Sequence, residues 1–332
     1  MGLPGKSAIW RVLVTGGAGF IGSRLVRRIE NEWDNAEVTV VDDFRSGNFK
    51  NLEGFKGELI TGDLAELKLR SFLASSDVDA IFHLASITDT REQDQRKMCW
   101  DNIESFRRIL EFSRRRKIPI VFASSAATYG IDAKVNTETD ACKPANVYGF
   151  SKVQLENLAA AYLSDPDLAG WKIAGVRYFN VYGPGEQHKG AMASMIYQLY
   201  LQMKDGKRPR VFEHGEQKRD FVHVDDVVDC TLRAMDSGKA AVFNAGSGEA
   251  RSFNDVIALL NKALKTKLEA EYISNPFAFF QPFTQADLTR SRRELGYEPQ
   301  YTLEKGIADY VRWLRGDPAP VSSRTSKVKA AV

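Results

Sequence analysis

Residues 15–22, with the sequence TGGAGFIG, decide the fold of this chain. They follow an apolar run at 8–15 that predicts a strand, and they lead into a helical pattern at 21–31. Glycines at this spacing allow a tight turn, close approach of the backbone to a pyrophosphate, and close packing of helix on strand. The helix also directs N–H groups and its positive dipole end at a phosphate. The stretch therefore predicts a dinucleotide-binding loop built on Gly16, Gly19 and Gly22.

The remaining pattern predicts an α/β fold with a doubly wound parallel sheet. Further strands are expected at 37–41, 80–84, 118–123 and 172–177, with helices at 102–116 and 151–163 between them. This alternation is typical of a parallel sheet with helices on both faces. We expect a dinucleotide-binding domain over 1–184, with a returning segment near 221–247. A smaller substrate domain is expected over 185–316, and a disordered tail over 317–332.

The second half of the chain has a less regular pattern. Helices are expected at 191–205, 224–235, 253–264 and 303–314. Residues 274–286 are aromatic and contain two prolines, so a packed loop is expected there.

Composition narrows the class of protein. The chain has 332 residues with a formal net charge of +3, which argues against a dedicated nucleic-acid binder. No apolar run approaches the roughly 18 residues that a membrane span needs, and the first residues lack the apolar core of a signal peptide. Three scattered cysteines, Cys99, Cys142 and Cys230, indicate reduced thiols without metal-site spacing. We therefore expect a cytoplasmic protein with no metal and no membrane or nucleic-acid partner.

Two acids follow the second strand at the distance that a ribose-binding fingerprint requires. Asp42 and Asp43 lie about 20 residues after the glycines, where an acid suits a free 2′-hydroxyl. Arg45 and Lys50 lie just beyond, and they either pair the 2′-phosphate of NADP or are solvated loop charges. Asp63 either holds the adenine amino group or caps a helix. From these residues, NAD and NADP both remain open.

A tyrosine and a lysine four residues apart form the candidate catalytic pair. On a helix, Tyr148 and Lys152 share a face, and a nearby ammonium would lower the pKa of the phenol. Lys152 can also hold the nicotinamide ribose; the alternative for both is a surface pair. Upstream, the sequence ASSAATYG at 123–130 places Ser124 and Ser125 at the carboxyl end of a strand, where ligands bind in open α/β sheets. The Ser125 hydroxyl is expected to hydrogen-bond the reacting oxygen beside Tyr148.

Together with RYFNVYGP at 177–184 and RDFVHVDDV at 219–227, these motifs resemble the extended short-chain dehydrogenase/reductase family, whose members modify nucleotide sugars. The resemblance covers about residues 8–315 and implies a Rossmann-type sheet with a smaller C-terminal α/β substrate domain. Within the family, SSAATYG, NVYGFSK, HKGAMAS at 188–194 and FTQADL at 283–288 are most similar to the ADP-L-glycero-D-manno-heptose 6-epimerases of lipopolysaccharide synthesis.

The resemblance implies a two-base epimerisation of ADP-D-glycero-D-manno-heptose, with NADP as the expected cofactor and NAD as the alternative. Hydride leaves carbon 6 of the sugar and returns to its other face, so two proton-handling groups are needed on opposite sides of that carbon. By motif position, Tyr148 is one and Lys189 is the other. From the residues alone, Lys189 is instead a phosphate-pairing or solvated charge.

Further cofactor and substrate residues follow from the same motifs. For the cofactor they are Phe20 and Ile21 at the pyrophosphate, then Leu84, Ala85, Ser86 and Asn102. For the substrate they are Asn180, Val181, Phe212, Glu213, His214, Gly215 and Arg219, where Arg219 either clamps the diphosphate or pairs with Asp220. Three positions depart from the best-known members: Ala191 replaces serine, Gln198 replaces histidine and Phe280 replaces tyrosine. They leave the exact nucleotide sugar open.

Proteins with competing functions are expected to differ from this chain at a few positions. A sugar 4,6-dehydratase of this family carries acids where Ala126 and Ala127 stand, so dehydration is disfavoured. A UDP-hexose 4-epimerase passes that test, but it needs no second base such as Lys189. A non-catalytic dinucleotide-sensing protein would commonly have lost Tyr148 and Lys152. A homo-oligomer formed through helices of the large domain is expected.

Overall fold

The computed structural model describes residues 10–73, 77–132, 134–275 and 281–317. Seven strands form the central sheet in the order β11-β7-β5-β4-β1-β2-β3, and every neighbouring pair is parallel. Their bounds are β1 (Trp10–Thr15), β2 (Ala36–Asp42), β3 (Glu58–Thr61), β4 (Ala80–His83), β5 (Ile120–Ser125), β7 (Ile173–Tyr178) and β11 (Val242–Ala245). This confirms the predicted doubly wound α/β fold. Strand order reverses at β1, which is where open α/β sheets bind ligands.

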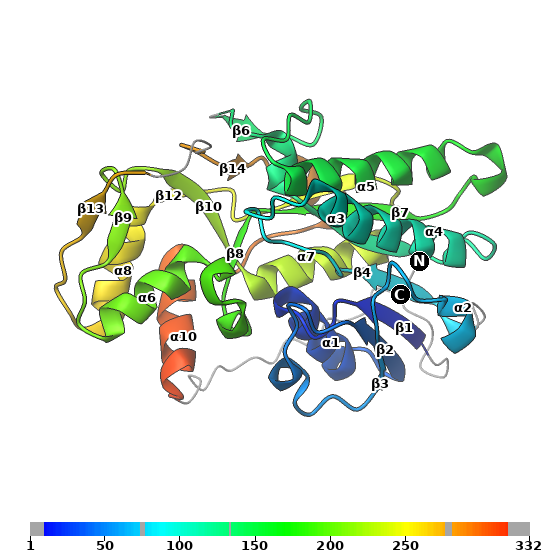
Figure 1. Cartoon of the computed structure of the whole chain (residues 1–332), viewed down its shortest axis with the longest axis horizontal. Helices are drawn as coiled ribbons and strands as arrows, with labels where there is room; N and C mark the ends of the chain where they lie inside the picture. Colours follow the sequence, from blue (N-terminus) through cyan, green and yellow to red (C-terminus); the bar gives the residue numbers. More distant parts are fainter. Residues whose placement is uncertain (1–9, 74–76, 133, 276–280, 318–332) are drawn as a thin grey trace.

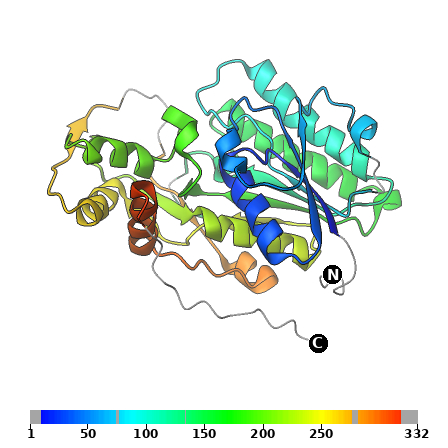
Figure 2. The ribbon, with the colours of Figure 1, turned by 90° about the horizontal axis from the view of Figure 1, so that it is seen from below.

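Alternating side chains of the sheet fill two cores, one on each face. On β1, Val12 and Val14 belong to one core and Leu13 to the other. The first core is closed by α1 (Phe20–Glu32), α7 (Val224–Ser237) and α9 (Thr289–Leu295); the second is closed by α4 (Ser105–Ser113) and α5 (Val147–Leu163). Figure 2 shows these helices on the two sides of the sheet. Burial on both faces explains why the strand sequences are mostly apolar and do not alternate with polar residues.

A smaller lobe built mainly from the second half of the chain lies beside the sheet (Figure 1). Its own core is shared by α6 (Met195–Lys204), α8 (Phe253–Leu264), α10 (Leu303–Arg315) and strands β8 (Asn180–Tyr182), β9 (Arg210–Phe212) and β10 (Lys218–His223). Strands β12 (Ala250–Ser252) and β13 (Glu271–Ile273) extend it by pairing with β10 and β9. Between β10 and β12 in the chain, α7 and β11 return to the large sheet at 224–245, inside the segment where a return was expected. The division into two domains stays a prediction.

Short elements complete the described fold. They are η1 (Phe49–Leu52), α2 (Leu69–Phe72), α3 (Gln95–Cys99), the π-helical turn η3 (Trp100–Glu104), η4 (Ala126–Tyr129), β6 (Val135–Asn136), η5 (Pro166–Leu168), η6 (Gln187–Met192) and β14 (Gln285–Ala286).

Three expected helices have different boundaries. The helix expected at 102–116 is α3, η3 and α4 in succession, beginning at Gln95. Helix α5 begins at Val147 rather than 151, because the side chain of Asn146 accepts the Gly149 N–H. Helix α6 begins at Met195 rather than 191, because Ser194 caps it and Gly190 has a φ of 54°. Of the expected loop at 274–286, residues 276–280 lie outside the described residues, as do 318–332 of the expected tail.

Candidate active site

A cavity of about 860 Å³ opens beside the carboxyl ends of the central strands and reaches the smaller lobe. This volume lies within the range of small-molecule and cofactor sites. Most of the residues that the sequence singled out line it: Gly16, Gly19, Phe20, Ile21, Gly22, Asp42, Asp43, Arg45, Asp63, Leu84, Ala85, Ser86, Ser125, Tyr148, Lys152, Asn180, Val181, Lys189, Phe212 and Arg219.

The other candidates that the structure describes do not reach the cavity wall; they are Lys50, Asn102, Ala191, Gln198, Glu213, His214 and Gly215. Asn102 is fully buried behind the wall, where its side chain bonds both the N–H and the C=O of Ile87. It therefore holds a wall segment from behind. The Gln198 amide is directed at the carbonyls of Ala191 and Ala193. Phe280 lies outside the described residues.

The glycine loop has the shape that a bound pyrophosphate needs. Gly16 has a φ of +72°, and a Cβ there would lie 2.6 Å from the Ala85 nitrogen. A Cβ on Gly22 would lie 2.1 Å from the Gly16 oxygen. The first turn of α1 has Gly19 as its N-cap and no side-chain cap. Its backbone therefore faces the cavity as an anion site, and these residues fit a dinucleotide.

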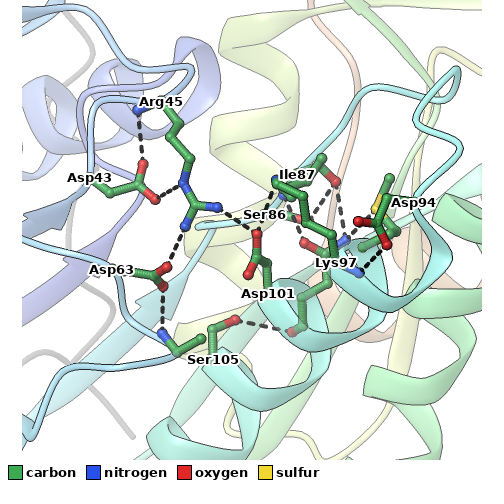
Figure 3. A network of polar contacts seen from close by, with 12 residues as sticks. Asp43, Arg45, Asp63, Ser86, Ile87, Asp94, Lys97, Asp101 and Ser105 are labelled. Atoms are coloured by element: carbon green, nitrogen blue, oxygen red, sulfur yellow. Dashed lines mark hydrogen bonds and ion pairs between the residues drawn. The ribbon is translucent and has the colours of Figure 1, made fainter.

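At the end of β2, Asp42 and Asp43 have different binding partners. Asp42 accepts hydrogen bonds of 2.9 Å from the backbone nitrogens of Ala18 and Phe44. Burial raises the pKa of its carboxyl, and those two N–H donors oppose the shift. Asp43 instead binds Arg45, which also contacts the carboxylates of Asp63 and Asp101 (Figure 3). Asp63 caps no helix: it accepts the Ala65 N–H in a turn.

Tyr148, Ser125 and Lys152 meet at the end of β5. The phenol is hydrogen-bonded to Ser125, and Lys152 Nζ lies 5.7 Å from the centroid of the phenol ring. We expected the ammonium to lower the pKa of the phenol. In the structure, burial raises the pKa of Tyr148 and the hydrogen bond with Ser125 opposes it. The reason is that burial also disfavours the charged ammonium, lowering the pKa of Lys152 to about 7.

The two adjacent serines are separated by the pleat of β5. Ser124 is buried and donates to Glu156, which also binds Arg177. Ser125 faces the cavity and the Tyr148 phenol. Both serines line the cavity, but the Ser124 hydroxyl is engaged by Glu156, so Ser125 is the candidate partner of a substrate oxygen there.

Lys189 reaches the same cavity from η6. Its Nζ lies 5.7 Å from the centroid of the Phe20 ring, above the start of α1. Burial lowers the pKa of Lys189, and the charge of Glu186 partly opposes that shift. A partly buried amine with a lowered pKa gives up its proton more readily than a solvated one, as an acid/base requires.

Arg219 lines the end of the cavity formed by the smaller lobe, with its guanidinium 5.9 Å from the centroid of the Phe253 ring. Burial lowers its pKa to about 10. The neighbouring carboxylate of Asp220 accepts the N–H groups of Ser247, Gly248 and Ala286. Asp220 is thus satisfied by backbone donors, which favours the interpretation of Arg219 as a ligand for an anionic substrate.

Sequence reasoning missed several wall residues. They include Ile87, Lys97, Asp101, His188, Gln217 and Phe253. Lys97 and Asp101 carried a weak signal, opposite charges four residues apart just before the helix expected at 102–116. The others had no pattern of their own.

Two absences hold for the residues described. No group of three or more His, Cys, Asp or Glu side chains among them could hold a metal ion. None of their helices has the length and apolarity that a bilayer crossing requires.

The sequence of the chain matches the model of the NAD dependent epimerase/dehydratase family over residues 12–246. The chain therefore belongs to this family of nucleotide-sugar-modifying enzymes, whose reactions depend on NAD or NADP. This agrees with the extended short-chain dehydrogenase/reductase resemblance of its motifs.

Among solved structures, the ADP-L-glycero-D-manno-heptose-6-epimerase of Helicobacter pylori is similar, with 37% identity and a TM-score of 0.85 over 94% of this chain and 98% of that one. The UDP-glucose 4-epimerase of Thermotoga maritima, solved with UDP-glucose, has 29% identity and a TM-score of 0.85 over 92% and 99%. The UDP-glucuronic acid 4-epimerase of Bacillus cereus, solved with UDP-glucuronic acid and NAD, has 27% identity and a TM-score of 0.81 over 92% and 99%. Heptose and hexose epimerases thus share this fold equally well.

Proposed function

We propose that this protein epimerises ADP-D-glycero-D-manno-heptose at carbon 6, using a bound nicotinamide dinucleotide and two bases, Tyr148 and Lys189. One observation supports it above the others: these two proton-handling side chains, one from each half of the chain, line a single cavity. The likeness to a heptose 6-epimerase at 37% identity supports the choice of sugar.

The residues divide the chemistry between them. Arg219 binds the diphosphate of the substrate and brings the sugar between the two bases. Tyr148, held by Ser125, takes the proton of the sugar hydroxyl while hydride leaves the carbon. When bound, the nicotinamide supplies the hydride acceptor and donor, and its oxidised ring adds a positive charge that favours phenolate. After the ketone turns over, Lys189 gives a proton to the oxygen as hydride returns to the opposite face.

The main alternative is a UDP-hexose 4-epimerase, which the neighbour at 29% identity supports. A 4-epimerase can work with the tyrosine as its single base. The position of Lys189 on the cavity wall favours the two-base reaction.

The cellular setting belongs to the same proposal. A heptose epimerase of this kind would act in the cytoplasm, in lipopolysaccharide synthesis. The homo-oligomer expected from the sequence stays a prediction, because one chain is described here.

The test is direct. Purified protein is incubated in parallel with ADP-D-glycero-D-manno-heptose, UDP-glucose and UDP-N-acetylglucosamine, and the epimer ratios are followed by NMR. We expect the heptose to epimerise at carbon 6 and the UDP-hexoses to stay unchanged. Turnover of a UDP-hexose alone would establish the 4-epimerase. Bound dinucleotide without turnover of any sugar would favour the non-catalytic sensor.

A further inference from the structure

Arg45 joins three separate segments at the adenosine end of the cavity (Figure 3). Its Nε lies 2.5 Å from Asp43 after β2, its Nη2 lies 2.7 Å from Asp63 after β3, and its Nη1 lies 2.5 Å from Asp101 in η3. Each of the three nitrogens of the guanidinium therefore has a carboxylate partner. All four residues line the cavity.

Negative charge is in excess at this end of the cavity. Asp42, Asp43, Asp63 and Asp101 supply four carboxylates, and Arg45 and Lys97 supply two cations. Lys97 Nζ lies 3.3 Å from the same Asp101 oxygen that binds Arg45, so it too is engaged. Lys50, the other cation expected at this place, does not line the cavity.

This arrangement of charges should affect the binding of NAD and NADP differently. A free 2′-hydroxyl is a neutral donor that a carboxylate accepts without moving Arg45. A 2′-phosphate is an anion, and binding it to Arg45 requires the guanidinium to leave the carboxylates. Those carboxylates would then face the phosphate as like charges.

We propose that the ring of carboxylates around Arg45 makes this chain select NAD over NADP. Arg45 then links the segments after β2, β3 and α3 through its ion pairs, and it does not bind a 2′-phosphate. The residues left both cofactors open and the family resemblance implied NADP; the engagement of Arg45 by three acids favours NAD. The inference rests on the proposed function only in requiring a dinucleotide with its adenosine at the end of β2.

The first experiment identifies the dinucleotide that the protein prefers. The purified protein is denatured and the released cofactor is identified by mass spectrometry; protein stripped of cofactor is then titrated with NAD⁺ and NADP⁺ by calorimetry. We expect NAD to be released, and to bind about tenfold or more tighter than NADP, because NADP must break three partly exposed ion pairs. Release of NADP, or NADP binding as tight as NAD, would overturn the proposal and leave the epimerase assignment intact. Binding of neither would overturn both.

Variants test whether the carboxylates cause the preference. Asp63→Asn combined with Asp101→Asn should raise the affinity for NADP relative to NAD about tenfold. Asp101→Asn alone should shift the ratio in the same direction and serves if the double variant does not fold. Asp309→Asn, which removes a carboxylate paired with Arg312 in α10, is the matched control and should change neither affinity. An unchanged ratio in both Asp101 variants, or a selective loss of NADP affinity in Arg45→Ala, would refute the role of the ring.

Discussion

The ammonium group of Lys152 donates a 2.9 Å hydrogen bond to the backbone carbonyl of Ala123. Ala123 belongs to β5 and lies two residues before Ser125, so this bond ties α5 to the strand end that carries the serine. Tyr148, one turn earlier on α5, is thereby fixed against Ser125. Lys152 itself is 2% exposed. The first role of this lysine in the folded chain is therefore to set the position of the phenol.

The pH dependence of the free energy of unfolding should reflect the burial of Lys152. Burial lowers the pKa of Lys152 to about 7, whereas an unfolded lysine titrates near about 10.4. The unfolded chain thus binds more protons between these values, so the free energy of unfolding rises with pH across that window. Lys152→Met removes this component. Its stability relative to the wild type should be most favourable below pH 7 and should decline toward pH 10, as measured by urea unfolding of cofactor-free protein. A difference that is constant with pH would show that the folded and unfolded chains bind this proton equally, so that the pKa of Lys152 is not lowered by folding.

Tyr148→Phe should abolish most of the epimerase activity while the dinucleotide stays bound. Removing a positioned acid/base typically costs about 10²–10⁴-fold in rate, and the phenol ring remains to pack in place. The measurement is the rate of epimer formation by NMR alongside calorimetric cofactor affinity. Tyr162→Phe is the matched control, because this tyrosine lies on the same helix and bonds Glu111 away from the cavity. Equal rates for the two variants would remove Tyr148 from the chemistry.

Glu156→Gln should destabilise the fold. Glu156 binds Arg177 through contacts of 2.6 and 2.9 Å, and the Arg177 side chain is 4% exposed. Neutralising the acid leaves a buried guanidinium without its counter-charge, which costs about 3–5 kcal/mol. Urea unfolding measures the loss. Combining Glu156→Leu with Arg177→Met should recover a large part of it, since an apolar pair needs no compensation; a double variant as unstable as Glu156→Gln would contradict this account.

The sheet was predictable because its residues follow local rules. The strands that carry the dinucleotide loop, Asp42 and Ser125 are short apolar runs bounded by glycine or polar residues, and burial on both faces makes them so. Helix boundaries were less predictable where capping decided them. Asn146 starts α5 early enough to include Tyr148, and the sequence pattern by itself indicated a start at Ser151.

Site residues were predictable where a motif fixes the backbone conformation. They were not predictable where their role depends on which side chain they contact in the folded structure. Gly16 and Gly22 are required by contacts that any Cβ would violate. Arg45 was expected either to bind a phosphate or to be a solvated charge, yet acids from the segment after β3 and from η3 reach it. That encounter depends on how loops distant in sequence converge. Asn102 was assigned to the cofactor, but it supports Ile87 from behind for the same reason.

Lys189→Met should abolish epimerisation of the heptose without weakening the binding of the dinucleotide. Under the two-base scheme, loss of the amine removes the acid on one face only, so the protein can still take hydride from the sugar through Tyr148. Mixing the variant with ADP-D-glycero-D-manno-heptose should therefore give the absorbance of reduced nicotinamide without the second epimer. Wild-type epimer formation by Lys189→Met would rule out this residue as the second base.

Glu186 lies buried behind the cavity wall, and its charge raises the pKa of Lys189. The variant Glu186→Gln should test this effect. This carboxylate is fully buried and accepts the Gly183 N–H at 3.1 Å, the Ser194 N–H at 2.5 Å and the Ser194 hydroxyl at 2.9 Å. It therefore ties together both ends of the segment that carries Lys189.

A glutamine at position 186 keeps the side-chain shape but turns an amide donor toward one of those donors. It also removes the charge that raises the pKa of Lys189 against the effect of burial. The pKa of Lys189 should fall further, so the limb of the pH–rate profile that Lys189 controls should move to lower pH, with a reduced maximal rate. Glu186→Asp, which keeps the charge, should move that limb less. A profile in Glu186→Gln that superimposes on the wild type, in a variant of unchanged thermal stability, would show that Glu186 holds the segment without acting on the proton of Lys189.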